Sequence, residues 1–342
     1  MTMQNPVYRF AIIGTGAAAH THAQAIGAIS NACLAGVYGD VPAQAKAFAE
    51  QYGCQCYPSA EALLQDKAVD IVTVCTPSGL HAHYAILAAM AKKHIVVEKP
   101  LAITAEQLDA VEQAVAENGV KATVIVQLRF CEAVQKLKTA IDSGVFGKIY
   151  NADCIMRYYR SEAYYTSSGW RGTWEMDGGG ALMNQGIHGV DLIQYLMGGI
   201  HKVYAQCRTA ARPIQTEDLA YMLVEYGNGA MGMIHGTTIA DPGQPRRITI
   251  CGEKGSVVLE EDTIAAWNID GQTQEVGSTQ SNAFRDPMAF SFANHQAQLE
   301  DLLRAIAEDR TPAVDTREGR KAVDIILAAY RSSQTGLAVS LD

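Results

Sequence analysis

The sequence predicts two domains: an α/β domain built on a doubly wound parallel sheet, and an α+β domain with a large, open, mostly antiparallel sheet. Strand-like and helical segments alternate over residues 7–125, the pattern of a parallel sheet with helical crossovers. After residue 127 this alternation gives way to strands joined by short turns. The 342 residues are also too many for one ordinary domain. We place the domains at 1–126 and 127–342, with closing helices that can pack back on the first domain.

The first domain begins with the apolar run Tyr8–Ile13, which stops at Gly14. The run at 71–75 is almost entirely apolar, as expected for a strand covered on both faces. A later helix ends at Asn118–Gly119, a common C-terminal stop. The remaining strands are expected at about 33–38, 94–98 and 123–127, and the helices at about 20–30, 42–52, 81–92 and 104–117.

The second domain is expected to be rich in strands. The segment Tyr226–Gly229 is a hairpin signal between two of them. One long helix, about 181–197, lies within the strand-rich part, and other helices are expected at about 131–143, 291–308 and 317–331. The strands are expected at 149–157, 201–209, 218–226, 230–237, 246–251 and 255–260.

The composition is that of a globular protein. Hydrophobic residues make up 48% of the chain, the net charge is −9 and the pI is about 5.5. No run of Lys and Arg stands out, so we expect neither nucleic acid nor a membrane as a partner. The N-terminus lacks a signal-peptide pattern and the eight cysteines lie mostly in apolar runs, so we expect a cytoplasmic protein with reduced core cysteines. No cluster has the spacing of metal ligands, so no metal is expected.

A glycine-rich turn follows the first strand directly. Its residues are Gly14, Thr15, Gly16, Ala17, Ala18 and Ala19, which match GxGxxA between a strand and a helix. Gly14 permits a tight turn, Gly16 lets the backbone approach a pyrophosphate, and Ala19 is small enough for close packing of helix on strand. The helix N-terminus adds N–H donors for an anion. The turn therefore predicts a dinucleotide site in a Rossmann domain, and the alternative is a tight turn that binds nothing.

Asp40, at the end of the second strand, is the candidate ligand of the ribose. A carboxylate at this place accepts hydrogen bonds from the adenosine ribose hydroxyls, which favours NAD over NADP. No Arg follows that would pair with a 2′-phosphate. NAD is the expected cofactor, with NADP left open. The alternative for Asp40 is a helix cap or turn residue.

Three further segments resemble the glucose-fructose oxidoreductase / inositol dehydrogenase / MocA (Gfo/Idh/MocA) family. They are Val74–Pro77 followed by His81, then Val97–Pro100, and then Gly178–Gly180 followed by His188 and Asp191. Their order and spacing cover almost the whole chain. The resemblance implies a Rossmann domain joined to an open antiparallel sheet, and hydride transfer on sugars, polyols or their derivatives. It places five residues at the nucleotide crevice: Thr76, Pro77, His81, Glu98 and Lys99.

The sequence departs from the family pattern at two places. Gly39 occupies the position that usually carries the ribose-binding acid, and Asp40 follows it. Asn184 stands four residues before the helix histidine, where inositol dehydrogenases carry Asp. The segment GGGALMNQGIH is more similar to that of sugar and nucleotide-sugar dehydrogenases than to that of inositol dehydrogenases.

Four residues are candidates for the chemistry of oxidising a secondary alcohol. His188 suits the base, since imidazole titrates near neutrality, and Lys99, at the end of a parallel strand, suits stabilisation of the alkoxide or relay of a proton. Asn184 and Asp191 share a helix face with His188 at spacings i, i+4 and i+7. Asp191 would fix the tautomer of His188, and Asn184 would bind a substrate hydroxyl. The alternatives are a buried histidine with a backbone partner and a structural helix aspartate.

Trp170 and Arg171 are the candidate substrate contacts outside that helix, in addition to Asn184 and His188. They belong to a segment rich in Tyr, Trp and Arg that precedes the triple glycine. Aromatic rings stack on sugar rings, and Arg binds a carboxylate or phosphate with two hydrogen bonds. The alternative is an ordered loop packed on the sheet or on another subunit.

An NAD(P)-dependent dehydrogenase or reductase acting on CH–OH groups of a sugar-like substrate is the leading hypothesis. One alternative is a non-catalytic, dinucleotide-binding regulator on the same fold. Another is a sugar hydrolase or epimerase that retains NAD without net oxidation. The open sheet would need a cover over its second face, so we expect a homodimer or homotetramer.

Overall fold

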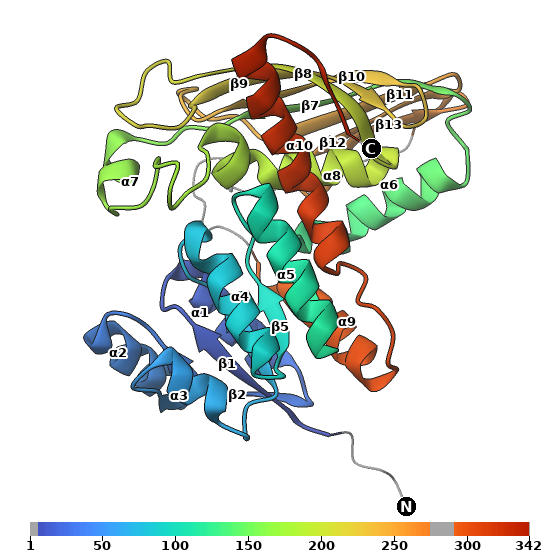
Figure 1. The fold of residues 1–342 in the computed structure, drawn as a ribbon. Helices are drawn as coiled ribbons and strands as arrows, with labels where there is room; N and C mark the ends of the chain where they lie inside the picture. The colour runs from blue at the N-terminus through green and yellow to red at the C-terminus, as the bar shows by residue number, and fades with distance from the viewer. Residues whose placement is uncertain (1–5, 274–290, 342) are drawn as a thin grey trace, which may run out of the picture. The chain divides into compact units, whose positions relative to one another are not determined.

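The computed structural model describes residues 6–273 and 291–341 (Figure 1). The described chain divides into two compact units, which are residues 6–127 with Ser291–Arg320 and residues 128–273 with 321–341. Helix α9 (Ala293–Ala307) therefore belongs to the first unit. Helix α10 (Thr316–Thr335) begins in the first unit and ends in the second.

The first unit contains a six-stranded sheet in the order β3-β2-β1-β4-β5-β6, and every neighbouring pair is parallel. The strands are β1 (Tyr8–Ile13), β2 (Ala32–Tyr38), β3 (Gln55–Cys56), β4 (Ile71–Val74), β5 (His94–Val97) and β6 (Ala122–Val124). The strand order reverses between β1 and β4. In such sheets ligands bind at this reversal, beyond the carboxyl ends of the strands.

Most of the helices that pack on this sheet connect its successive strands, and α9 comes from the C-terminal part of the chain (Figure 1). They are α1 (Ala17–Ala28), α2 (Pro42–Tyr52), α3 (Ala60–Gln65), the short 3₁₀ turn η1 (Ser78–Leu80), α4 (His81–Met90), α5 (Ala105–Asn118) and α9. Thr104 caps the start of α5, and Gly119 ends it in the left-handed conformation. Apolar side chains of α1, α2 and α9 share one core with the sheet, including Ile26, Phe48 and Leu299.

The second unit contains a nine-stranded sheet in the order β14-β13-β12-β11-β7-β10-β9-β8-β15. Its strands are β7 (Ile149–Arg157), β8 (Ile200–Arg208), β9 (Leu219–Tyr226), β10 (Met231–Thr237), β11 (Arg247–Gly252), β12 (Gly255–Glu260), β13 (Thr263–Ile269), β14 (Gln272–Thr273) and β15 (Val339–Ser340). All neighbouring pairs are antiparallel except β7 and β10, which run parallel. The expected mostly antiparallel sheet is confirmed.

The remaining helical segments belong mainly to this second unit, and Figure 1 shows α6 and α8 lying along one face of its sheet. The segments are the 3₁₀ turn η2 (Gln127–Phe130), α6 (Glu132–Asp142), α7 (Glu162–Thr166), η3 (Ala181–Gly186), α8 (Ile187–Met197) and α10. Along β9, residues alternate between buried and exposed, because among the described residues the helices cover one face of this sheet only.

The expected single α-helix over 181–197 is wrong in its first part. Residues Ala181–Gly186 form a π-helix, and only Ile187–Met197 is α-helical. The backbone N–H of Gln185 donates to the carbonyl of Gly180, a π-type bond. The reason is tertiary: the buried Glu217 carboxylate accepts the N–H groups of Gly180 and Leu182 and holds the helix start. Asn184 therefore lies in the π-helical part and His188 in the α-helical part.

The cysteines are all free, but the expectation that most are core residues is wrong. Cys75, Cys131 and Cys154 are buried, whereas the other five are exposed or of intermediate exposure. Within the described residues, no helix is long and apolar enough to cross a membrane.

Candidate active site

The glycine-rich turn leaves no room for a side chain at its first residue. Gly14 has φ +116°, and a Cβ there would lie 2.3 Å from the carbonyl oxygen of Cys75. Its N–H donates to the carbonyl of Tyr38 at 2.8 Å. The turn is thus held against the ends of both neighbouring strands, β2 and β4, and glycine is required.

Gly16 is the N-cap of α1, and the space around its absent side chain is open. A Cβ built there would have no heavy atom within 4 Å. No described side chain caps this helix end, and the first turn contains no acidic residue. The unsatisfied N–H groups and the positive end of the helix dipole suit an anion. The turn therefore fits the pyrophosphate of a dinucleotide.

Asp40 lies exposed just after β2, close to this turn. One of its carboxylate oxygens accepts a hydrogen bond from the Tyr38 hydroxyl at 3.0 Å. This hydrogen bond, with burial and the Asp40 charge, raises the pKa of Tyr38 to about 12. A Cβ at Gly39 would lie 2.7 Å from the Thr15 side chain, so the glycine lets the end of β2 approach the turn closely. The second Asp40 oxygen is the one suited to a ribose hydroxyl.

The turn after β4 is tied to the turn after β5 by the buried His81 ring. Nδ1 of His81 lies 2.6 Å from the carbonyl oxygen of Pro100, and Nε2 lies 2.8 Å from that of Thr76. Burial lowers the pKa of this ring, although both carbonyls favour its protonated form. The Thr76 hydroxyl oxygen is buried and has no hydrogen-bond partner among the described residues. A ligand in the crevice would satisfy such a group.

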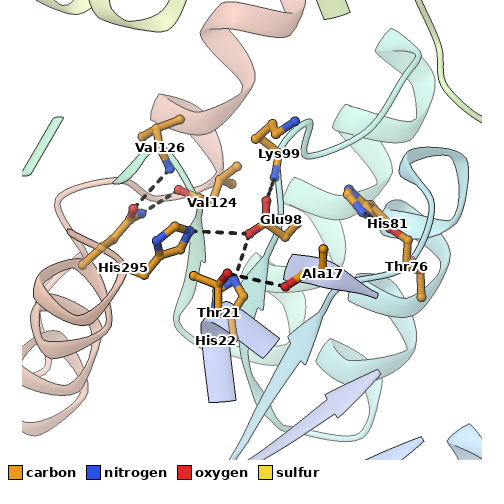
Figure 2. Close-up of polar contacts among 11 residues, drawn as sticks. Ala17, Thr21, His22, Thr76, His81, Glu98, Lys99, Val124, Val126 and His295 are labelled. Carbon is orange, nitrogen blue, oxygen red and sulfur yellow. Dashed lines mark hydrogen bonds and ion pairs between the residues drawn. The ribbon is translucent and has the colours of Figure 1, made fainter. Parts of the chain in front are cut away.

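Glu98 and Lys99 follow β5 and differ in exposure. Glu98 is buried, and Figure 2 shows His22 and His295 approaching its carboxylate. His22 Nε2 lies 2.9 Å from Oε1 of Glu98, and His295 Nε2 lies 3.9 Å from the same oxygen. The other oxygen accepts the backbone N–H of Lys99 at 3.2 Å. The Glu98 carboxylate is therefore bound by the protein itself, and Lys99 is the more accessible of the two.

His22, Glu98 and His295 are the one group of three metal-type side chains in the described part of the chain, with ligand atoms within 4.8 Å of one another. A metal-bound imidazole nearly always donates its second N–H to a neighbour. The Nδ1 atom of His22 is buried and has no such neighbour within the described residues, whereas the His295 ring has a hydrogen bond with the backbone of Ser291. The three side chains form a buried, hydrogen-bonded cluster around the Glu98 carboxylate, in which His22 lacks the second neighbour that is typical of a metal ligand.

In the second unit, the segment from Ala181 to Gln194 is buried except for three polar residues. Asn184, Gln185 and His188 have intermediate exposure, while all other residues of this stretch are buried. A helix with one accessible polar strip presents that strip to a ligand or to solvent. Two of the three are candidates from the sequence, and Gln185 is new.

Asp191 lies one turn after His188 and is paired with Arg129. The Nε and Nη2 atoms of Arg129 donate to the two carboxylate oxygens at 2.8 and 2.6 Å. Both side chains are at most 4% exposed. The Arg129 guanidinium also lies over the Tyr195 ring, 4.6 Å from its centre. The pair therefore fixes α8 to the turn η2, which corresponds to the structural alternative for Asp191, and the sequence did not indicate Arg129 as its partner.

A chain of hydrogen bonds connects the accessible strip to the aromatic segment. Gln185 donates to the Tyr164 hydroxyl at 2.7 Å and to the Asn184 side-chain oxygen at 3.1 Å. Asn184 donates to Asp177 at 2.6 Å. The Arg171 guanidinium lies 4.3 Å from the centre of the Tyr164 ring. Asn184 and Arg171 are thus joined within one network.

Trp170 contributes to the same network through Arg171. The Arg171 guanidinium lies 5.5 Å from the centre of the Trp170 ring and donates to the carbonyl of Tyr164. Its Nε is buried and has no hydrogen-bond partner among the described residues. Arg160 adds a second guanidinium, which donates from Nε to Gln185 at 2.9 Å.

Comparisons with known proteins identify the family. Residues 8–126 match the model of the oxidoreductase family with an NAD-binding Rossmann fold (GFO/IDH/MocA), and residues 134–258 match the GFO/IDH/MocA C-terminal domain. The expected fold, family and NAD cofactor are confirmed by these matches.

Three relatives cover nearly the whole chain. The WlbA dehydrogenase from Bordetella pertussis, solved with NADH and UDP-GlcNAcA, is 30% identical with a TM-score of 0.88, over 99% of both chains. The WlbA dehydrogenase from Chromobacterium violaceum, solved with the same two ligands, is 32% identical with a TM-score of 0.86, over 100% of this chain and 99% of the other. Myo-inositol 2-dehydrogenase from Thermotoga maritima is 25% identical over 98% of both. The chain belongs to the Gfo/Idh/MocA family of NAD-binding oxidoreductases.

Proposed function

We propose that the protein transfers a hydride between NAD and a secondary hydroxyl or ketone group of an anionic sugar, with nucleotide-linked sugar acids as the leading class. The observation that carries the proposal is the accessible strip Asn184, Gln185 and His188 on the otherwise buried segment 181–194. Asn184 and Gln185 are hydrogen-bonded toward Tyr164, over whose ring Arg171 lies. A strip of this kind can bind sugar hydroxyls, and a guanidinium beside it can bind an acid group.

Each candidate residue has a distinct task in this proposal. Gly14 to Ala18, Asp40 and the turn Thr76–Pro77 hold the dinucleotide, whose nicotinamide supplies the hydride acceptor. Lys99 stabilises the alkoxide, and His188 takes the hydroxyl proton. Asn184 binds a neighbouring hydroxyl of the sugar. Asp191, already bound by Arg129, contributes by holding α8 in place.

The acid group is assigned to Arg171 because of its surroundings. The Arg171 guanidinium lies over the Tyr164 and Trp170 rings, and its Nη1 donates to the carbonyl of Tyr164 and the hydroxyl of Ser167. A guanidinium held by its neighbours in this way suits a carboxylate or a phosphate. The two relatives of highest identity above were solved with UDP-GlcNAcA, which supports the same class.

The test is to measure the rate at which the reduced cofactor forms, by its absorbance, with a panel of sugars. The panel is UDP-GlcNAcA, UDP-GlcNAc, free glucuronate and myo-inositol, each with NAD and with NADP. We expect turnover with UDP-GlcNAcA and NAD, and a loss of at least tenfold in kcat/KM when the carboxylate is absent. Arg171→Leu should raise KM for the acid more than for the neutral sugar, while Arg247→Leu, exposed on the sheet, should change neither. Turnover restricted to myo-inositol would refute the assignment.

We also propose that the protein works in the cytoplasm as a homodimer or homotetramer formed through the exposed sheet face. Four large side chains on β8, β9 and β10 are 41–58% exposed on this face: Tyr204, Tyr221, Leu223 and Met231. The register places Tyr204 opposite Leu223, so they form a patch rather than isolated residues.

Light scattering should give a dimer or larger, and Leu223→Glu should give monomers. Met90→Glu, equally exposed on α4, is the matched control. A monomeric wild-type protein at micromolar concentration would contradict this proposal.

A further inference from the structure

Glu217 is a buried carboxylate, 2% exposed, that has no part in the proposed reaction so far. Its Oε2 atom accepts the backbone N–H of Gly180 at 3.0 Å, and its Oε1 atom accepts that of Leu182 at 2.8 Å. Its backbone carbonyl accepts the N–H of Ala181, which lies between them, at 2.8 Å. Glu217 therefore binds three consecutive N–H groups at the start of the site helix (η3 and α8), where a helix leaves its first N–H groups without partners.

The hydroxyl of Tyr330, on α10, completes this arrangement. It donates to the same Oε1 atom of Glu217 at 2.9 Å. A Cβ at Gly179 would lie 2.1 Å from the Tyr330 hydroxyl oxygen, and a Cβ at Gly180 would lie 2.1 Å from the Glu217 carbonyl oxygen. Two of the three glycines before the site helix are thus required because Glu217 and Tyr330 approach the backbone so closely.

A carboxylate is a costly group to bury at this place. Burial raises the pKa of Glu217 to about 7, although the hydrogen bonds that it accepts favour the ionised form. A glutamine of the same shape would carry no charge, but it has one acceptor oxygen, and its NH₂ group would face an N–H group of the helix start. The carboxylate is therefore the group that can bind the N–H groups of Gly180 and Leu182 at the same time.

The form of the helix start bears on the two candidate site residues. Asn184 lies in the π-helical part, where its side chain donates to Asp177 at 2.6 Å, and His188 lies in the α-helical part. A π-type turn closes its hydrogen bond over one residue more than an α-helical turn. Conversion of the π-helical part into an α-helix would therefore turn Asn184 around the helix axis relative to His188.

We propose that Glu217 and Tyr330 form a positioning pair, which holds Ala181–Gly186 in its π-helical form. The pair acts on the proposed reaction through the helix, because it sets where Asn184 lies relative to His188. This inference rests on the proposed function of these two side chains. Its structural part, the π-helical start, is measurable without turnover.

The main test is Glu217→Gln, which keeps the size of the side chain and removes one acceptor. We expect kcat for the sugar to fall by about tenfold to a hundredfold, since a displacement of about 1 Å at a site can cost about a hundredfold. KM for NAD should stay nearly unchanged, because the dinucleotide turn belongs to the first unit. Tyr330→Phe leaves both N–H groups bound to Glu217, so it should lower kcat less, and it is the second variant if Glu217→Gln does not fold.

Tyr226→Phe is the matched control for a loss of stability alone. Its hydroxyl is buried and donates to the carbonyl of Ala152 at 2.8 Å, at the end of β9 that is farther from Glu217. Each Tyr→Phe variant loses one buried hydrogen bond, so both should have a lower Tm. Below that Tm, kcat should fall in Tyr330→Phe and stay unchanged in Tyr226→Phe. A wild-type kcat in both Glu217→Gln and Tyr330→Phe would reduce the pair to a role in stability and overturn the proposal.

A crystal structure of Glu217→Gln is the readout that does not depend on turnover. We expect residues 181–186 to become α-helical and Asn184 to lose its hydrogen bond to Asp177. An unchanged π-helical segment would overturn the proposal, whatever the activity. If the wild-type protein oxidises no sugar of the panel, the proposed function fails, while the crystal structure still decides whether Glu217 holds the helix start.

Discussion

Replacing Asp191 by Asn separates two roles for this residue, holding α8 and orienting His188. The change leaves the Arg129 guanidinium, 4% exposed, without a countercharge. Loss of one partner of a buried pair costs about 3–5 kcal/mol, and we expect about 3 because Asn keeps one acceptor. A domain of this size class loses about 2–4 °C in Tm per kcal/mol, so the Tm should fall by roughly 6–12 °C.

The assay is thermal unfolding followed by circular dichroism, together with kcat/KM measured well below the lower Tm. The double variant Arg129→Met/Asp191→Leu is the control, since a buried ion pair replaced by apolar groups is often neutral for stability. It should recover most of the lost Tm. A Tm that changes by less than about 2 °C in Asp191→Asn, with a large loss of kcat/KM, would refute the structural role and favour contact with His188.

Three other predictions follow from the two sites. Gly16→Val should abolish NAD binding measured by calorimetry and leave the Tm unchanged, because the new side chain enters open space in front of α1. The control Gly27→Ala also enters open space and should bind NAD normally. Equal NAD affinities of the two variants would place the pyrophosphate elsewhere. Lys99→Ala and His188→Ala should each reduce kcat by about a hundredfold or more. The double variant should lose far less kcat than the product of the two single losses, because the two residues act as a unit. Independent losses would argue against a shared substrate hydroxyl. His295 takes up a proton near its ordinary pKa of 6.5 in the unfolded chain but only near 4 in the folded chain. The free energy of unfolding should therefore decrease as the pH falls from 6.5 to 4, and this decrease should be smaller in His295→Leu. An identical pH dependence in both proteins would contradict the lowered pKa.

The sequence predicted most of the helices and strands, because the patterns that mark them depend only on residues within the same segment. The GxGxxA turn and the apolar run of β4 reflect steric and burial requirements that a single segment reveals. Along β9 the alternation of side chains marks the covered face directly. Strand β13 was missed, since its sequence TIAAWNI contains two adjacent alanines that blur the alternation. The π-helical start of the site helix was missed because Glu217, which causes it, comes from a distant segment.

The partners of the candidate residues were beyond the reach of sequence patterns. His22 stands on the buried face of α1 with Ala19 and Ile26, and a histidine in such a stripe signals a buried polar partner. Nothing local identifies that partner as Glu98, or adds His295 from α9. Arg129 belongs to a short 3₁₀ turn, so no periodicity pointed to its pairing with Asp191.

The position of α9 has a consequence for biosynthesis. The first unit is completed by Ser291–Arg320, which a ribosome makes only after most of the second unit. Until then, the side chains that pack on Leu299, Leu302 and Leu303 remain uncovered, and Glu98 lacks the neighbouring His295. The nascent Rossmann sheet would therefore expose an apolar face for much of translation, the kind of surface that chaperones recognise. A fragment ending at Gln127 should aggregate unless the α9 segment is supplied in trans.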